Sequence, residues 1–249
     1  MKKMSIPRLA LTTVSALALT AALQVRADTL AQWTFETSGP SITGTSATFG
    51  GIVPETLYSG ATAAASGTHA GAGTVWSSPS GNGSPHSFSA NLWAQGDYFQ
   101  FTLSPDLTDY TYSGIAVSYD QNGSATGPKT FYFAYSTDGS TWNTVGSDYA
   151  LTSGITWSTG TGGQPTQESF DLSAITALDT ASTMYFRIVD DSATTGGAIN
   201  GGNVGTAGTD RTDNFTITAS VTAIPEPASA ALLTGFAGLL AWNVIRRRR

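Results

Sequence analysis

The chain has 249 residues, a formal net charge of −6 and no cysteine. The lack of cysteine excludes a disulfide framework and any zinc or haem site built on a cysteine cluster. His69 and His86 supply the only imidazoles, and both lie among small residues typical of exposed loops.

The N-terminus has the three parts of a secretory signal peptide. Lys2, Lys3 and Arg8 precede an apolar run over residues 9–25, and residues 25–27 read Val-Arg-Ala, a −3/−1 pattern suited to signal peptidase. We therefore expect a signal peptide over residues 1–27 and export by the secretion machinery. A retained N-terminal anchor is the alternative.

The segment over residues 28–223 is strongly acidic. It holds three basic and 16 acidic residues, a formal net charge of −13. Such a surface repels the phosphates of nucleic acids and anionic lipids, so a nucleic-acid role is excluded. The segment is long enough to bury one sizeable core.

Several short segments alternate apolar and polar residues, the pattern of half-buried strands. They are residues 31–35, 88–92, 99–103, 115–119, 131–135, 170–172, 184–188 and 215–221. Asp138-Gly139 predicts a hairpin turn, residues 173–178 predict one helical turn, and the small-residue stretch 61–73 predicts a mobile loop. No segment has a sustained helical period, which predicts a single all-β domain, a jelly-roll-like β-sandwich over residues 28–223.

The last 26 residues, 224–249, have three parts in fixed order. Pro225, Glu226 and Pro227 come first, and an uncharged apolar run over residues 228–245 follows. At about 1.5 Å per residue, a helix of that length just crosses a hydrocarbon core. The segment closes with a basic cluster, which is Arg246, Arg247, Arg248 and Arg249. This cluster predicts that the C-terminus stays in the cytoplasm and that everything upstream of Pro225 lies outside it.

This tail resembles the PEP-CTERM sorting signal of bacterial envelope proteins. The resemblance rests on the tripeptide, the apolar helix and the arginine cluster, and it covers about a tenth of the chain. It implies anchoring in the inner membrane, processing by exosortase near the Pro-Glu-Pro motif, and delivery to the cell surface or an exopolysaccharide matrix. A permanent tail anchor with a proline-rich hinge is the alternative.

Acidic and amide side chains gather near the ends of predicted strands, where loops are expected. Such oxygens from separate loops suit Ca²⁺, which takes six to eight oxygen ligands. No run has EF-hand spacing, and solvated turn acids are the alternative. A structural Ca²⁺ is the one cofactor that the sequence suggests, and its candidate ligands are Asp190, Asp191, Asp210, Asp213 and Asn214.

Two tryptophans are candidates for contact with a glycan. Trp142 follows the predicted hairpin turn, and Trp157 lies in a Thr/Gly-rich loop, so both are expected to be more exposed than the others. A flat ring with an apolar face can stack on a pyranose. Burial in the core is the alternative.

The sequence favours a non-enzymatic role. It has no G-x-S-x-G elbow, no H-E-x-x-H motif and only three glutamates in the exported part, Glu36, Glu55 and Glu168. The two exported arginines, Arg187 and Arg211, are expected to form structural ion pairs, Arg187 with Asp190 or Asp213. We therefore predict an exported structural or interaction protein, with a carbohydrate-binding module as the alternative and a glycoside hydrolase as a weaker one.

Overall fold

The computed structural model describes residues 27–160 and 162–225, together with Trp242 and Arg246. The predicted signal peptide up to residue 26 and the predicted sorting signal from Glu226 onward lie outside these residues, apart from Trp242 and Arg246. Within the described residues, no helix has the length and apolar character that a membrane span requires.

The described domain is all-β, as the alternating patterns predict. Its strands are β1 (Ala27–Trp33), β2 (Thr48–Ile52), β3 (Thr56–Leu57), β4 (Thr62–Thr68), β5 (Trp76–Ser77), β6 (Phe88–Ala90), β7 (Tyr98–Ser104), β8 (Tyr110–Gly123), β9 (Thr130–Ser136), β10 (Asn143–Ala150), β11 (Gln167–Asp171), β12 (Met184–Asp190) and β13 (Asp210–Ala223).

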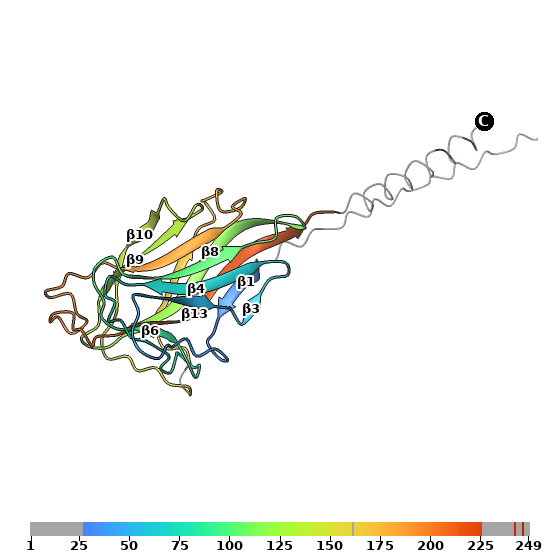
Figure 1. Cartoon of the computed structure of the whole chain (residues 1–249). Coiled ribbons are helices and arrows are strands. Elements are labelled where there is room, and N and C mark those ends of the chain that lie inside the picture. Colours follow the sequence, from blue (N-terminus) through green and yellow to red (C-terminus); the bar gives the residue numbers. More distant parts are fainter. Residues whose placement is uncertain (1–26, 161, 226–241, 243–245, 247–249) are drawn as a thin grey trace, which may run out of the picture.

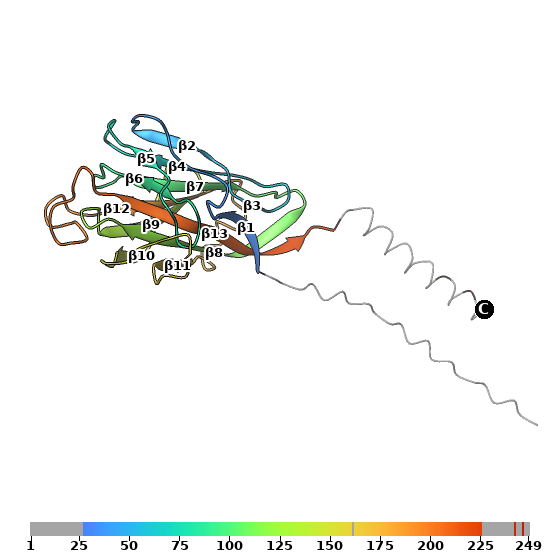
Figure 2. The ribbon, with the colours of Figure 1, turned by 90° about the horizontal axis from the view of Figure 1, so that it is seen from below.

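The strands form two antiparallel sheets. Sheet A has the order β11-β8-β13-β1-β3, with β6 added to one part of β13 and β5 added to β6. Sheet B has the order β10-β9-β12-β7-β4-β2. The strands of both sheets run along the long axis of the domain (Figures 1 and 2). Ala27 at the start of β1 pairs with Ser220 near the end of β13, so the described chain enters and leaves at the same end.

Aromatic rings from both sheets meet in the interior. Phe101 of β7 and Phe215 of β13 stack with their centroids 3.5 Å apart, and Tyr119 of β8 lies 5.5 Å from Phe215. All three side chains are fully buried. The alternation of β7, β8 and β13 predicts this inward face, and burial of such rings is the main favourable term that holds the two sheets together. Since the core lies within residues 27–223, this part is expected to fold on its own.

The prediction of a mobile loop over residues 61–73 is wrong. β4 lies within this stretch and pairs with both β2 and β7. A Cβ added to Gly67 would lie 2.3 Å from the ring of Trp76, so small residues are required here by a large neighbour. His69 follows β4 and is buried between Trp76 and Trp93, contrary to the expected surface position. Residues 173–178 form turns in place of the expected helical turn.

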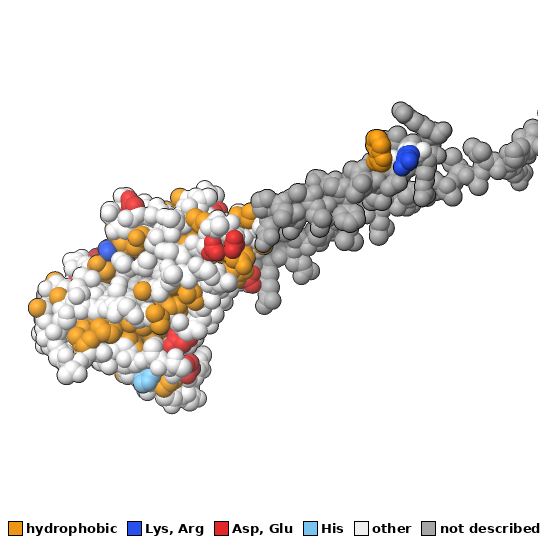
Figure 3. All heavy atoms as spheres, turned by 45° about the vertical axis from the view of Figure 1, so that its right-hand side comes forward, with side chains coloured by type: hydrophobic (Ala, Val, Ile, Leu, Met, Phe, Trp, Pro, Cys, Tyr) orange, Lys and Arg blue, Asp and Glu red, His pale blue; other side chains and the backbone are white. Residues whose placement is uncertain are grey.

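Charged side chains are sparse on the surface in view, and most of them are acidic (Figure 3). Figure 3 shows acidic side chains in small, separate groups on the face in view, with very few basic ones. In the described domain the basic residues are Lys129, Arg187 and Arg211. The surroundings of these scarce cations therefore bear on any ligand that carries charge.

Candidate functional site

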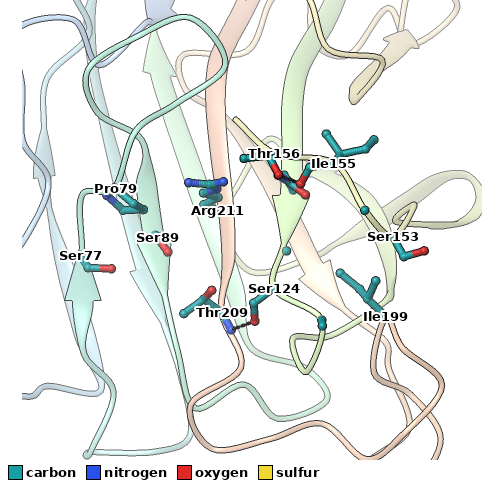
Figure 4. Close-up of a pocket in the computed structure, with 14 residues that line it drawn as sticks. Ser77, Pro79, Ser89, Ser124, Ser153, Ile155, Thr156, Ile199, Thr209 and Arg211 are labelled. Atoms are coloured by element: carbon teal, nitrogen blue, oxygen red, sulfur yellow. Dashed lines mark hydrogen bonds between the residues drawn. The ribbon is translucent and has the colours of Figure 1, made fainter. Parts of the chain in front are cut away.

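A hollow of about 520 Å³ lies on the outer face of sheet A. Its floor is formed by β13 and β8, one wall by β5, β6 and the segment 78–87, and the other wall by residues 153–156. Figure 4 shows Arg211 at the centre of this hollow, with Pro79 on one side and Thr156 on the other. We call it the Arg211 groove, and its lining is Ser77, Pro79, Ser89, Asn122, Gly123, Ser124, Ala125, Ser153, Gly154, Ile155, Thr156, Ile199, Thr209 and Arg211.

Strand register explains why the groove is polar. Arg211 of β13 lies opposite Asn122 of β8 and Ser89 of β6, and residues directly opposite in an antiparallel pair point to the same face. The next pair along β13, Thr212 and Gln121, points inward. The period of two thus delivers guanidinium, amide and hydroxyl groups to one outer face.

Among the described residues, Arg211 packs over one aromatic ring. Its guanidinium carbon is 4.9 Å from the centre of the Trp157 ring, and its Nη1 donates a 2.7 Å hydrogen bond to the carbonyl of Ser80. Burial lowers the pKa of Arg211 from its usual value, but arginine stays protonated in proteins. A permanent cation is thus fixed in the groove.

The wall formed by residues 78–87 is tied to sheet A by Asp213. Its Oδ2 accepts hydrogen bonds of 2.7 Å from the backbone N–H of Asn82 and from Ser84 Oγ. A Cβ at Gly81 would lie 2.2 Å from Asp213 Oδ2, so only glycine allows this close approach. Burial raises the pKa of Asp213 to about 6. Asp213 therefore shapes the groove while its own oxygens are occupied.

The opposite wall is tied down in a similar way. Asn122 Nδ2 donates to the carbonyl of Ile155 over 3.2 Å, and Trp157 Nε1 donates to Thr166 Oγ1 over 3.2 Å. These bonds hold the segment that carries Trp157 against the edge of β8. The groove is thus bounded by two segments that are each bonded to the sheet beneath them.

The structure does not bring the five predicted calcium ligands together. Asp213 and Asn214 lie on the outer side of sheet A, where Asn214 Nδ2 donates to Asp120 Oδ2 over 2.9 Å. Asp210 points inward and accepts a hydrogen bond from Gln121 Nε2, and Asp190 alternates inward with Ile188 on sheet B. Asp191 accepts from Gln95 near the surface. In the part of the chain that the structure describes, no three His, Cys, Asp or Glu residues form a metal-binding group.

The expectation that these residues lie in loops is correct only for Asp191, which follows β12. Asp190 ends β12, and Asp210, Asp213 and Asn214 lie in β13. The segments predicted for β8 and β13 are shorter than the strands themselves. The remaining parts of these strands are rich in buried polar residues, and polar residues in a sequence normally indicate a loop.

Asp190 and Asp210 are a buried pair on facing sheets. Asp190 is 1% exposed and Asp210 is fully buried, and each has one carboxylate oxygen with no hydrogen-bond partner among the described residues. Burial raises the pKa of Asp190 to about 6, and burial followed by the nearby charge of Asp190 raises the pKa of Asp210 well above its usual value. This pair is the part of the predicted calcium cluster that retains unsatisfied oxygens.

The two predicted glycan-contact tryptophans have different surroundings. Trp157 is 3% exposed, so the expected exposure is wrong, and its ring supports Arg211. Trp142 is half-buried on the outer face of sheet B, where Arg187 lies 3.7 Å from the centre of its ring.

The ion pairs expected for the two arginines do not form within the described residues. Arg187 lies between the rings of Tyr98 and Trp142 and donates to Gln100 Oε1 and to the Tyr98 hydroxyl. Arg211 bonds to a backbone carbonyl. The Arg211 groove was missed by sequence reasoning, although the alternation of Arg211 and Asp213 along one strand is a signal that both share a face.

Comparison with known proteins gives little beyond this geometry. No family model matches the chain, and no curated protein matches it. Several solved structures are similar in part, and two of them are described here. One is the carbohydrate-binding module TmCBM61 in complex with beta-1,4-galactotriose, with 9% identity, a TM-score of 0.32, and coverage of 64% of this chain and 88% of that one. The other is the C-terminal domain of a chitobiase from Bacteroides fragilis, with 14% identity, a TM-score of 0.24, and coverage of 51% and 66%. The function is therefore argued from the groove.

Proposed function

We propose that residues 28–223 form an exported carbohydrate-binding domain and that the Arg211 groove holds the glycan. The observation that carries this proposal is the lining. Hydroxyl groups come from Ser77, Ser124 and Thr209, an amide from Asn122 and a guanidinium from Arg211. Sugars present many hydroxyls that donate and accept hydrogen bonds, and this set offers both functions.

The size and apolar parts of the groove fit the same ligand class. Its volume of about 520 Å³ lies within the usual range of ligand clefts. Pro79, Ile155 and Ile199 add apolar surface to the lining, which suits the C–H faces of a pyranose. A binding site with few apolar side chains and several polar ones also suits a ligand that remains partly in water.

The lining supports binding over hydrolysis. Most glycosidases flank the scissile bond with two carboxylates, about 5–10 Å apart. Among the described residues, no Asp or Glu side chain lines the Arg211 groove. We propose a non-enzymatic role on this ground.

A groove-filling substitution tests the proposal. Ser77 is half-buried in the lining, so Ser77→Tyr should obstruct the groove and abolish retardation of the domain in gels that contain soluble polysaccharides. Ser113→Tyr is the control, since Ser113 is exposed near the other end of β8 and pairs with Ser220. If a panel of neutral and acidic polysaccharides retards neither wild type nor control, the domain is not a carbohydrate-binding module.

We further propose that the C-terminal segment is an exosortase sorting signal and that the domain, with its predicted jelly-roll-like connections, is delivered to the cell surface or an exopolysaccharide matrix. In support, Pro225 follows the end of β13 almost directly, which leaves little linker between the fold and the motif. Glu226→Ala should leave the protein uncleaved in the inner membrane, as measured by intact mass after fractionation. Normal release of that variant would refute the sorting proposal.

A further inference from the structure

We infer that the Arg211 groove selects polysaccharides that carry carboxylate groups, such as uronic acids, over neutral ones. The inference rests on the proposed glycan binding and names the substrate class of the same groove. Three observations support this inference. They are the unused hydrogen-bond donors of Arg211, the absence of acidic side chains among the described residues of the lining, and the different surroundings of Arg187.

Arg211 retains hydrogen-bonding capacity toward the groove. Its side chain makes one hydrogen bond, to the Ser80 carbonyl, and no ion pair among the described residues. The Trp157 ring covers one side of the guanidinium. A guanidinium has five N–H donors in a planar fork, so several donors remain for a ligand that enters the groove (Figure 4).

The acids nearest to Arg211 lie outside the lining of the groove, although the charges of Asp210 and Asp213 act on Arg211. Arg211 is the only charged residue among the described residues of the lining. Asp213 is a neighbour on the same face, but its Oδ2 accepts bonds from Asn82 and Ser84 of the segment 78–87 and its Oδ1 accepts from the backbone N–H of Asn214, so both oxygens are occupied. The distant acids of the domain act weakly because salt screens charges beyond about 8 Å at physiological ionic strength.

A carboxylate is the anion that this donor geometry fits best. Arginine and carboxylate form two parallel N–H···O bonds when the fork is free at one edge. The Trp157 ring and the hydrogen bond to the Ser80 carbonyl already restrain the Arg211 side chain, so less side-chain freedom is lost when a planar anion binds. A neutral sugar hydroxyl would gain only single hydrogen bonds from the same group.

Arg187 provides an internal comparison. Tyr98 and Trp142 lie on its two sides at 3.7 Å each, and Gln100 and Tyr98 accept its hydrogen bonds. Two of its N–H donors are thus engaged by the protein, and an aromatic ring packs against the guanidinium from each of two residues, where Arg211 has one such ring and one such bond. Substitution of Arg187 changes the net charge by the same amount as substitution of Arg211 but leaves the groove intact.

The test compares acidic polymers with neutral polymers of the same backbone. Polygalacturonate, alginate and glucuronoxylan are each offered beside their carboxyl-reduced forms, and the dissociation constants for residues 28–223 are measured by affinity electrophoresis. We expect at least one acidic polymer to bind ten times or more tightly than its reduced form. Arg211→Gln should remove this preference, Arg211→Lys should weaken it several-fold, and Arg187→Gln should leave it unchanged.

The outcomes separate the two proposals. Binding of a reduced form as tightly as its acidic parent, unaffected by Arg211→Gln, would overturn carboxylate selection and leave glycan binding in place. Failure of every polymer in both forms would overturn the proposed function, and this inference with it. Equal binding of a sulfated polymer such as dextran sulfate would show attraction to anions in general and also overturn selection of carboxylates.

Melting curves of each variant report whether that variant still folds. If Arg211→Gln does not fold, increasing NaCl should weaken wild-type binding of the acidic form and spare the reduced form, and equal salt response of both forms would overturn the inference.

Discussion

The two outer faces of the sandwich each carry an arginine packed on a tryptophan, and they differ in what remains for a ligand. On sheet B, Arg187 lies between Tyr98 and Trp142 and is engaged on both sides. On sheet A, Arg211 rests on Trp157 alone and lines a hollow between two bonded segments. Both arginines are partly exposed, so the difference between them is the number of protein partners, and on this difference we base the proposal that Arg211 recognises the ligand.

The largest expected effect comes from removal of the supporting rings. Trp157→Ala should lower the free energy of unfolding by roughly 3 kcal/mol, because a buried ring is replaced by a cavity, and should weaken glycan binding at least tenfold by releasing Arg211. Trp142→Ala should cost about 1 kcal/mol, since that ring is half-exposed, and should leave binding unchanged. Chemical denaturation and affinity electrophoresis measure the two quantities. Loss of binding in Trp142→Ala would reverse the assignment of the two faces.

The strands that carry the two arginines also carry the buried acids Asp190 and Asp210. Burial raises the pKa of Asp190 to about 6. In the unfolded chain the pKa of Asp is about 3.9. A raised pKa in the folded state contributes stability that is fully present at pH values below about 3.9 and is lost as the pH rises through about 6. Asp190→Asn should therefore gain roughly 2–3 kcal/mol in stability relative to wild type between pH 4 and pH 8.

The difference between variant and wild type isolates Asp190 from His69. Burial lowers the pKa of His69 to about 4, so this group acts in the opposite direction, losing stability as pH falls from 6.5 to 4. Because His69 is present in both proteins, its effect cancels. Asp191→Asn, next to Asp190 but bonded to Gln95 near the surface, serves as the control. A pH-independent difference for Asp190→Asn would show that the buried carboxylate does not titrate as proposed.

The smallest expected effect is that of calcium. Asp190 and Asp210 each have one carboxylate oxygen without a partner in the part of the chain that the structure describes, and these oxygens are the remaining basis for a bound cation. We expect Ca²⁺ at about fivefold excess over its Kd to add about 1 kcal/mol of stability, or 2–4 °C in Tm, relative to EDTA. Asp190→Asn should remove the response, and Asp213→Asn should keep it, since Asp213 faces the other side of sheet A. Identical melting curves in Ca²⁺ and EDTA would show that the domain does not bind calcium.

The sequence predicts the core strands well because their large apolar residues alternate. β7, β12 and residues 215–221 of β13 follow this pattern. Their inward-facing residues Phe101, Phe186 and Phe215 are fully buried. The pattern of β4 predicts a loop because its residues are small, and the ring of Trp76, which requires Gly67, is nine positions away in the sequence. The strand pairs were not predictable from local patterns.

The candidate site was less accessible to sequence reasoning than the fold. Arg211 meets Trp157 and Ser80 only after β13 pairs with β8 and β6. Serine, asparagine and glycine line the groove, and in sequence these residues indicate loops in general. A ligand site made of such residues has no local signature, so its recognition requires the register of three strands.

The position of β13 has a mechanical consequence. This strand is 14 residues long, or about 45 Å at the usual rise per residue. Arg211 lies near its start, and the described chain leaves the domain after its end. A pull between a polymer held in the groove and an attachment beyond Pro225 would run along β13. The hydrogen bonds from β13 to β8 and β1 lie across that direction, so the load would be shared by the whole ladder at once, and the domain would resist shear better than peeling.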